Sequence, residues 1–127
     1  MSKELIIKKC LNCGATVKVI KDCTCSSDCG IKCCGEKMQV LTPNSVDAAA
    51  EKHVPTYEVK DGKIYLTVNH VMDEDHFIEW ASIVYDNKEK TKYFKPGETA
   101  TMHCKYVPGA KLYAYCNKHG LWSSEVE

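Results

Sequence analysis

Apolar and polar residues alternate along much of residues 49–127, and such alternation predicts β-strands with one buried face. Three alternating rows begin or end on a histidine or a cysteine: Ile64, Leu66, Val68 and His70; His76, Ile78, Trp80 and Val84; and Leu112, Ala114 and Cys116. Turn-forming pairs separate the runs at Asp61-Gly62, Asp86-Asn87, Pro96-Gly97 and Pro108-Gly109. Short strands at such regular spacing are typical of an antiparallel sandwich. We therefore expect ligand-type side chains at the ends of buried strands.

In a fourth alternating row, the neighbouring residues His103 and Cys104 fall on opposite faces of the predicted strand. Cys104 is in phase with Ala100, Met102 and Tyr106, whereas His103 is in phase with polar residues. We expect Cys104 to be a buried thiol and His103 a surface residue, since free cysteine is among the most buried residue types. Neither is then expected to bind metal.

The first 41 residues differ in composition from the rest, because they hold seven of the nine cysteines and no histidine. A unit this small buries little apolar surface and needs a further constraint, which cysteine-bound metal would supply. Thr42-Pro43-Asn44-Ser45 is typical of a turn or linker, and residues 47–51 favour a short helical turn. The predicted organisation is a cysteine-rich metal-binding domain at 1–41, a linker at 42–48 and a sandwich domain at 49–127.

The composition of the chain limits the classes of protein to which it can belong. Of 127 residues, 44% are hydrophobic and 27% are charged, as in a soluble globular protein. Seventeen basic and 17 acidic residues cancel, which argues against a nucleic-acid partner. No apolar run is long enough to span a membrane, and the first residues lack the apolar stretch of a signal peptide, so we expect a cytoplasmic location. In that reducing compartment, nine cysteines indicate metal binding rather than disulfides.

Four of the five histidines and one cysteine fall in three short segments: Glu51-Lys52-His53, His70 to His76, and Cys116-Asn117-Lys118-His119. The loop from His70 to His76 can bring both rings to one point, and one turn can present Cys116 and His119 to the same ion. Imidazole and thiolate bind iron, copper and zinc, but four ligands usually satisfy zinc. Five ligands with one open position indicate iron.

The cysteine-rich segment contains a second candidate site. Cys10-Leu11-Asn12-Cys13-Gly14 forms a C-x-x-C-G knuckle, in which the glycine permits a turn that directs backbone amides at sulfur. Cys33-Cys34-Gly35 would supply a second pair of thiolates. Four thiolates around one ion suit iron or zinc.

Three segments of the chain resemble the superoxide reductase family: Glu51 to Pro55, His70-Val71-Met72 with His76 to Trp80, and Cys116 to Gly120. Over nearly its full length, including Ser45 to Ala49 and the Lys95-Pro96-Gly97 turn, the chain is similar to the two-domain desulfoferrodoxins. The resemblance implies an all-β fold. A small rubredoxin/desulforedoxin-like metal-bound domain would precede an immunoglobulin-like seven-stranded antiparallel β-sandwich, and two chains would form a homodimer.

The same resemblance implies one-electron reduction of superoxide to hydrogen peroxide at iron that cycles between Fe²⁺ and Fe³⁺. It implies four imidazole ligands in a plane and an axial thiolate: His53, His70, His76 and His119, with Cys116. Lys52 is expected to attract the anionic substrate and stabilise developing charge, and Lys118 to add positive field. Glu51 resembles the family glutamate that takes the sixth position of oxidised iron. The electron would come from an external donor, rubredoxin or a similar small redox protein.

In the N-terminal domain, the resemblance to desulforedoxin implies iron, or alternatively zinc, bound by Cys10, Cys13, Cys33 and Cys34. The chain departs from the family between these pairs, where Cys23, Cys25 and Cys29 are additional. They are free thiols, a second site or competing ligands, and Cys29 can replace one member of the second pair. The N-terminal centre either relays electrons or only folds its domain.

Two other functions stay open from the sequence. One is a non-catalytic electron carrier that uses the four-cysteine site, and the other is a metal-binding or zinc-storage protein. The charged pair Glu51-Lys52 beside His53 favours the enzyme, because neither alternative needs such a pair at an open metal site.

Overall fold

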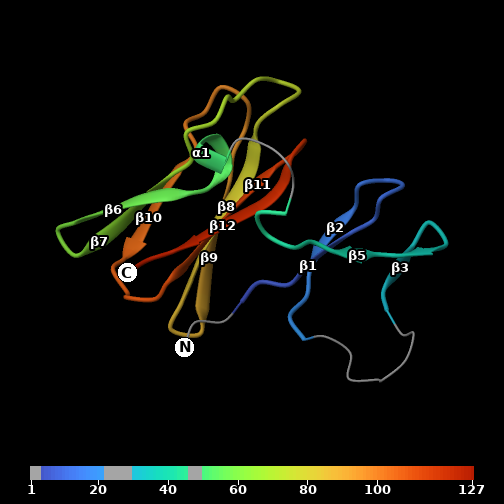
Figure 1. The fold of residues 1–127 in the computed structure, drawn as a ribbon, viewed down its shortest axis with the longest axis horizontal. Coiled ribbons are helices and arrows are strands. Elements are labelled where there is room, and N and C mark those ends of the chain that lie inside the picture. The colour runs from blue at the N-terminus through green and yellow to red at the C-terminus, as the bar shows by residue number, and fades with distance from the viewer. Residues whose placement is uncertain (1–3, 22–29, 46–49) are drawn as a thin grey trace. The chain divides into compact units, whose positions relative to one another are not determined.

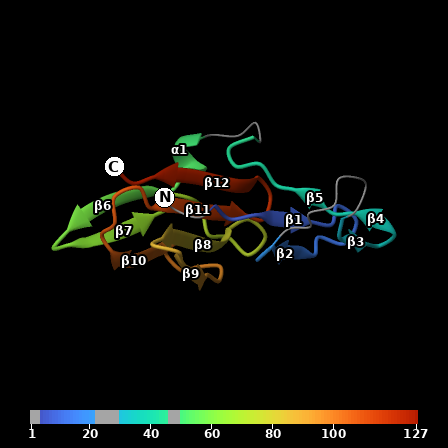
Figure 2. The same ribbon diagram turned by 90° about the horizontal axis from the view of Figure 1, so that it is seen from below.

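Seven antiparallel strands form two facing sheets in the C-terminal part of the chain (Figure 1). The computed structural model describes residues 4–21, 30–45 and 50–127. One sheet has the order β10-β7-β6 and contains β6 (Thr56–Lys60), β7 (Lys63–Thr67) and β10 (Thr101–Lys105). The other has the order β12-β11-β8-β9 and contains β8 (Ile78–Tyr85), β9 (Lys88–Tyr93), β11 (Lys111–Cys116) and β12 (Gly120–Glu125), which run side by side in Figure 2. The expected immunoglobulin-like seven-stranded sandwich is confirmed.

Alternating rows from both sheets build the core of the sandwich. Three of the predicted rows lie in it: Ile64, Leu66 and Val68; Ala100, Met102 and Cys104; and Leu112, Ala114 and Cys116. His103 is exposed on the outer face of β10, where its ring lies 5.7 Å from that of Tyr65. The assignments of Cys104 to the core and of His103 to the surface are therefore confirmed.

The alternating row predicted along β8 is wrong from Trp80 onward, because the strand contains a bulge. Ile78 pairs with Cys116 and Trp80 pairs with Tyr115, so Glu79 is an extra residue that shifts the phase of the strand. The core side chains after the bulge are Ala81 and Ile83. Trp80 and Val84 lie on the opposite face of the sheet, where the indole of Trp80 stacks on the ring of Tyr115 at 5.8 Å.

Two tight hairpins set the register on either side of the core. Asp61 and Gly62 connect β6 to β7 with φ of 52° and 73°, and Asp86 and Asn87 connect β8 to β9 with φ of 45° and 60°. Positive φ at both central residues is the geometry of type I′ turns, whose twist matches that of paired strands. Both predicted turns are confirmed.

Residues 5–42 form a separate unit, whereas Glu4 belongs with the part of the chain from Pro43 onward. In this unit, β1 (Ile7–Lys9), β2 (Thr16–Lys18) and β5 (Gln39–Val40) form a sheet of order β2-β1-β5, and β3 (Lys32–Cys33) pairs with β4 (Glu36–Lys37). Its buried hydrophobic residues among those described are Ile7, Cys10, Val19 and Met38. The expected boundaries at 41 and 48 stay predictions, because residues 46–49 lie outside the described part.

One helix is present among the described residues, the single turn α1 (Ala50–His53). It agrees with the helical turn expected before His53, although residues 47–49 of that prediction lie outside the described part. In the same described ranges, no helix has the length and apolar character that a membrane crossing requires.

Candidate metal centres

Five side chains from separate elements of the sandwich unit meet at one point. His53 ends α1, His70 follows β7, His76 precedes β8, Cys116 ends β11, and His119 lies in the turn that leads into β12. One ligand atom from each of the five lies within 4.8 Å of the corresponding atoms of the others. The fold thus brings together all five residues that the sequence analysis expected at this centre.

The four imidazoles form a closed ring. Going around it, the centroids are 4.7 Å apart for His53 and His70, 4.6 Å for His70 and His76, 5.1 Å for His76 and His119, and 4.9 Å for His119 and His53. Cys116 is not a member of this ring, but its Sγ lies 3.5 Å from His70 Nε2 and 3.8 Å from His119 Nδ1. The arrangement suits one ion with four nitrogen donors around it and one sulfur donor.

Individual nitrogen atoms indicate which side of each ring faces the centre. His70 Nδ1 lies 2.5 Å from the carbonyl oxygen of Val71 and donates to it, which leaves Nε2 for an ion. His53 Nε2 lies 3.1 Å from His119 Nδ1. His76 Nε2 is buried and has no hydrogen-bond partner. A buried polar atom without a partner is unfavourable unless it binds something else, so this nitrogen fits a metal ligand.

The electrostatics of the ring favour neutral imidazoles. Burial holds the pKa of His70 below its usual value of 6.5, although the hydrogen bond to the Val71 carbonyl raises it in part, and the nearby His53, His76 and His119 lower it further. Burial, followed by His53 and His76, likewise holds the pKa of His119 below its usual value. Neutral imidazole is the form that binds metal, so at neutral pH these rings can bind an ion without first losing a proton.

The two sides of the centre differ in exposure. Cys116 is fully buried and His53 is 4% exposed, whereas the other three imidazoles are half-buried. The thiolate therefore lies on the inner side of the ring. Solvent reaches three of the four imidazoles in part, so the centre is accessible from outside the protein.

Trp122 supports two ligands and was missed by the sequence analysis. Its ring stacks on that of His53 with centroids 4.9 Å apart, and its Nε1 donates to the carbonyl of His119 at 3.0 Å. The side chain is 2% exposed. A buried tryptophan near the turn was visible in the sequence, but nothing there linked it to His53.

The two charged residues expected at the open position belong to α1. Lys52 is exposed and precedes the buried ligand His53. Glu51 lies in the same turn, but its side chain is outside the described part. The roles of both residues stay predictions.

The second centre lies in the unit of residues 5–42. One ligand atom each from Cys10, Cys13, Cys33 and Cys34 lies within 4.8 Å of the others. Cys13 Sγ is 3.6 Å from Cys33 Sγ, which in turn is 3.9 Å from Cys34 Sγ. All the cysteines described are free thiols. The additional Cys23, Cys25 and Cys29 lie outside the described residues, so their role stays open.

The backbone of the knuckle prepares one of these thiols for metal. The amide of Cys13, followed by that of Asn12, hydrogen-bonds to Cys10 and lowers the pKa of its thiol to about 7. Hydrogen bonds among the crowded thiols, that from Cys13 first, raise the pKa of Cys33 to about 12. A bound cation offsets the repulsion between neighbouring thiolates, so all four sulfurs can lose their protons and bind it.

Known proteins resemble the chain over the same residues. A family model described as "Desulfoferrodoxin" matches residues 45–125, which include all five residues of the His/Cys centre. The desulfoferrodoxin of Syntrophotalea carbinolica is 37% identical, with 98% of this chain and 99% of that protein covered. The desulfoferrodoxin of Desulfarculus baarsii has the same identity and the same coverage.

Solved structures share the fold. The superoxide reductase from Treponema pallidum has a TM-score of 0.70 and 22% identity, with 96% of this chain and 99% of that chain covered. The 1Fe superoxide reductase from Giardia intestinalis has a TM-score of 0.53 and 22% identity, with 60% of this chain and 97% of that chain covered. At these identities the matches establish the architecture.

Proposed function

The chain belongs to the desulfoferrodoxin family, and from that premise we propose that it is a superoxide reductase. In the reaction, one superoxide takes up one electron and two protons and leaves as one hydrogen peroxide, without formation of dioxygen. The observation that carries the proposal is the ring of four imidazoles with one buried thiolate on its inner side. The structural neighbours named as superoxide reductases support the same function.

The donor set suits iron better than zinc. Four ligands complete a zinc site, whereas five ligands leave iron with one free position. His53, His70, His76, His119 and Cys116 would hold the iron, and its change from the ferrous to the ferric state would supply the electron. The partner-free Nε2 of His76 and the neutral state favoured for His70 support metal binding by the ring. Because Cys116 is fully buried, its sulfur is kept away from solvent and oxidants.

We propose that lysines near the centre guide the substrate. Lys52 is exposed and adjacent in sequence to His53, so its cation raises the local concentration of anionic superoxide. Lys118 lies between Cys116 and His119, but its ammonium is 4.0 Å from the carboxylate of Asp75, which offsets part of its charge. Glu51 would serve as a further ligand of oxidised iron, and this role rests on the resemblance of Glu51-Lys52-His53 to the family segment. The two protons come from water, which can approach the outward side of the ring.

The four-cysteine centre is proposed to hold a second iron or a zinc ion through Cys10, Cys13, Cys33 and Cys34. Its unit has few buried residues among those described, and metal binding compensates for so small a core. We therefore propose that the first role of this centre is to stabilise the fold of its unit.

The remaining expectations concern the surroundings of the protein. We propose a rubredoxin-like electron donor, a homodimer and a location in the cytoplasm, where the thiols stay reduced. Reoxidation of reduced rubredoxin that depends on both this protein and superoxide would support the donor. The mass of the iron-loaded protein in solution, measured by light scattering, tests the dimer.

Product stoichiometry tests the reaction itself. Reduced, iron-loaded protein is given a known amount of superoxide without air, and peroxide and dioxygen are counted. One peroxide per superoxide and no dioxygen is the expected result. One peroxide and one dioxygen for every two superoxides would mean dismutation, and a rate no faster than the spontaneous background would favour the electron carrier.

A further inference from the structure

The backbone around His76 is held on both sides. Asp73 and His76 form an isolated antiparallel bridge, in which the Asp73 amide donates to the His76 carbonyl at 3.0 Å and the His76 amide donates to Asp73 at 3.3 Å. Each peptide group that flanks His76 therefore has one of its two polar atoms bound to Asp73. The other two atoms are the carbonyl of Asp75 and the amide of Phe77.

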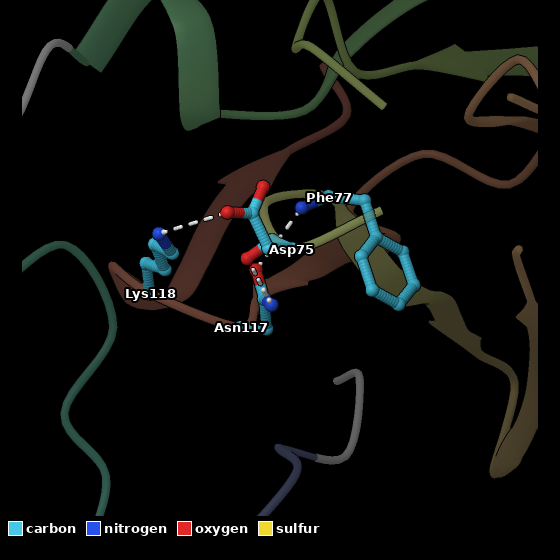
Figure 3. A network of polar contacts seen from close by, with 4 residues as sticks. All are labelled: Asp75, Phe77, Asn117 and Lys118. Carbon is cyan, nitrogen blue, oxygen red and sulfur yellow. Dashed lines mark hydrogen bonds and ion pairs between the residues drawn. The ribbon is translucent and has the colours of Figure 1, made fainter. Parts of the chain in front are cut away.

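The side chain of Asn117 binds both of these remaining atoms (Figure 3). Its Nδ2 donates to the Asp75 carbonyl at 3.0 Å, and its Oδ1 accepts from the Phe77 amide at 3.0 Å. Its own backbone amide also donates to the Phe77 carbonyl at 3.2 Å. With these bonds, both peptide groups next to His76 are fully hydrogen-bonded.

The backbone next to His76 is fully hydrogen-bonded, whereas the Nε2 atom of its imidazole is not. His76 Nε2 is buried without a hydrogen-bond partner, so no such bond at this atom orients the ring. Its position depends instead on the hydrogen-bonded backbone and on the ring contacts with His70 and His119. Asn117 directly follows the thiolate ligand Cys116, which belongs to a segment 40 residues from His76 in the chain.

We propose that Asn117 is a positioning residue that holds His76 and Cys116 in a fixed relation, so that both ligands are in place before iron binds. The inference rests on the metal centre of the proposed function but not on its reaction. Groups that orient metal ligands typically contribute about 10- to 100-fold to metal affinity. Because Asn117 acts through the backbone on one ligand and is the chain neighbour of another, its loss should disturb the geometry at the iron as well as the affinity.

Release of iron from the ferric full-length protein to EDTA tests the proposal. The signal of this centre is identified as the thiolate-to-iron charge-transfer band that the Cys116→Ser variant lacks. For Asn117→Ala we expect iron release about 10- to 100-fold faster, a shifted band, and more than one ferric species by electron paramagnetic resonance. Asn117→Asp keeps the acceptor for Phe77 but sets a carboxylate oxygen against the Asp75 carbonyl, so it should also release iron faster than the wild type. Asn117→Asp also tests the proposal if the alanine variant fails to fold.

Asp75→Asn is the matched control. It weakens the exposed ion pair with Lys118, which joins the same two loops, and leaves the Asp75 carbonyl available to Asn117. Its band and its iron release should match those of the wild type. An unchanged band and release in Asn117→Ala, or an equal loss in Asp75→Asn, would overturn the inference. A wild-type protein that retains iron but does not reduce superoxide would instead overturn the proposed function and leave this inference standing.

Discussion

The indole of Trp122 stacks on the imidazole of His53 at 4.9 Å and donates from its Nε1 to the carbonyl of His119 at 3.0 Å. One buried side chain thus contacts two proposed ligands that are 66 residues apart. Trp122→Phe keeps an aromatic ring against His53 but loses the hydrogen bond, which should cost about 1 kcal/mol. Trp122→Ala loses both contacts and should cost about 3–5 kcal/mol. Urea unfolding of the metal-free protein measures the two values, and equal values would mean that the ring contact with His53 contributes nothing.

Cys116→Ser should remove the charge-transfer band and most superoxide reduction, because a hydroxyl is a weak substitute for the thiolate that we propose as an iron ligand. The substitution is small, so the far-ultraviolet circular dichroism of the fold should be unchanged. Cys104→Ala is the matched control, since Cys104 is also a buried thiol but lies in the core away from the ligand group. Cys104→Ala should keep both band and activity, and a Cys116→Ser protein with normal activity would refute the proposal that Cys116 is an iron ligand.

Lys52→Ala should slow the second-order reaction with superoxide by up to about tenfold at low ionic strength, because one attracting charge is lost. The dependence of the rate on salt should weaken at the same time. Lys88→Ala removes the same charge from the start of β9 and should leave the rate nearly unchanged. Pulse radiolysis measures these rates, and equal rates for the two variants would show that Lys52 is ordinary surface charge.

The stability of the metal-free protein should fall as the pH is lowered through about 6.5. The pKa of His70 and of His119 is lowered in the folded state, so the unfolded chain binds more protons in this range. Their contribution is complete above 6.5, the unfolded value, and is lost as the pH falls toward the folded pKa. Urea midpoints at pH 7.5 and 5.5 measure the slope. His70→Asn should flatten this slope, and an unchanged slope in that variant would contradict the prediction.

Cys13→Ser should remove metal from the N-terminal centre alone, since one of four thiolates is lost. Metal content should fall from about two ions to about one per chain. Proteolysis within residues 5–42 should become faster, whereas the charge-transfer band of the other centre should persist. Loss of both ions would contradict the assignment of two independent centres.

The sequence by itself determined the class of strand fold and the types of ligand side chain at both centres. Alternation around Ile64 and Leu112 specified two core strands, because a strand repeats every two residues and one face must avoid water. Asp61-Gly62 and Asp86-Asn87 specified hairpins, because these residues tolerate positive φ. The ligand types were also visible, since imidazole and thiolate are intrinsic to the side chains.

Only the tertiary structure decided how these parts meet. The bulge at Glu79 reversed the phase of β8, and alternation could not reveal it because it is defined by the pairing with β11. The same holds for Trp122 beneath His53 and for Asn117 around His76, whose contacts join distant segments. The full burial of Cys116 and the partial exposure of three imidazoles are likewise results of packing. Local residue preferences describe neighbours in the chain, whereas these features depend on packing between strands that only the folded protein brings together.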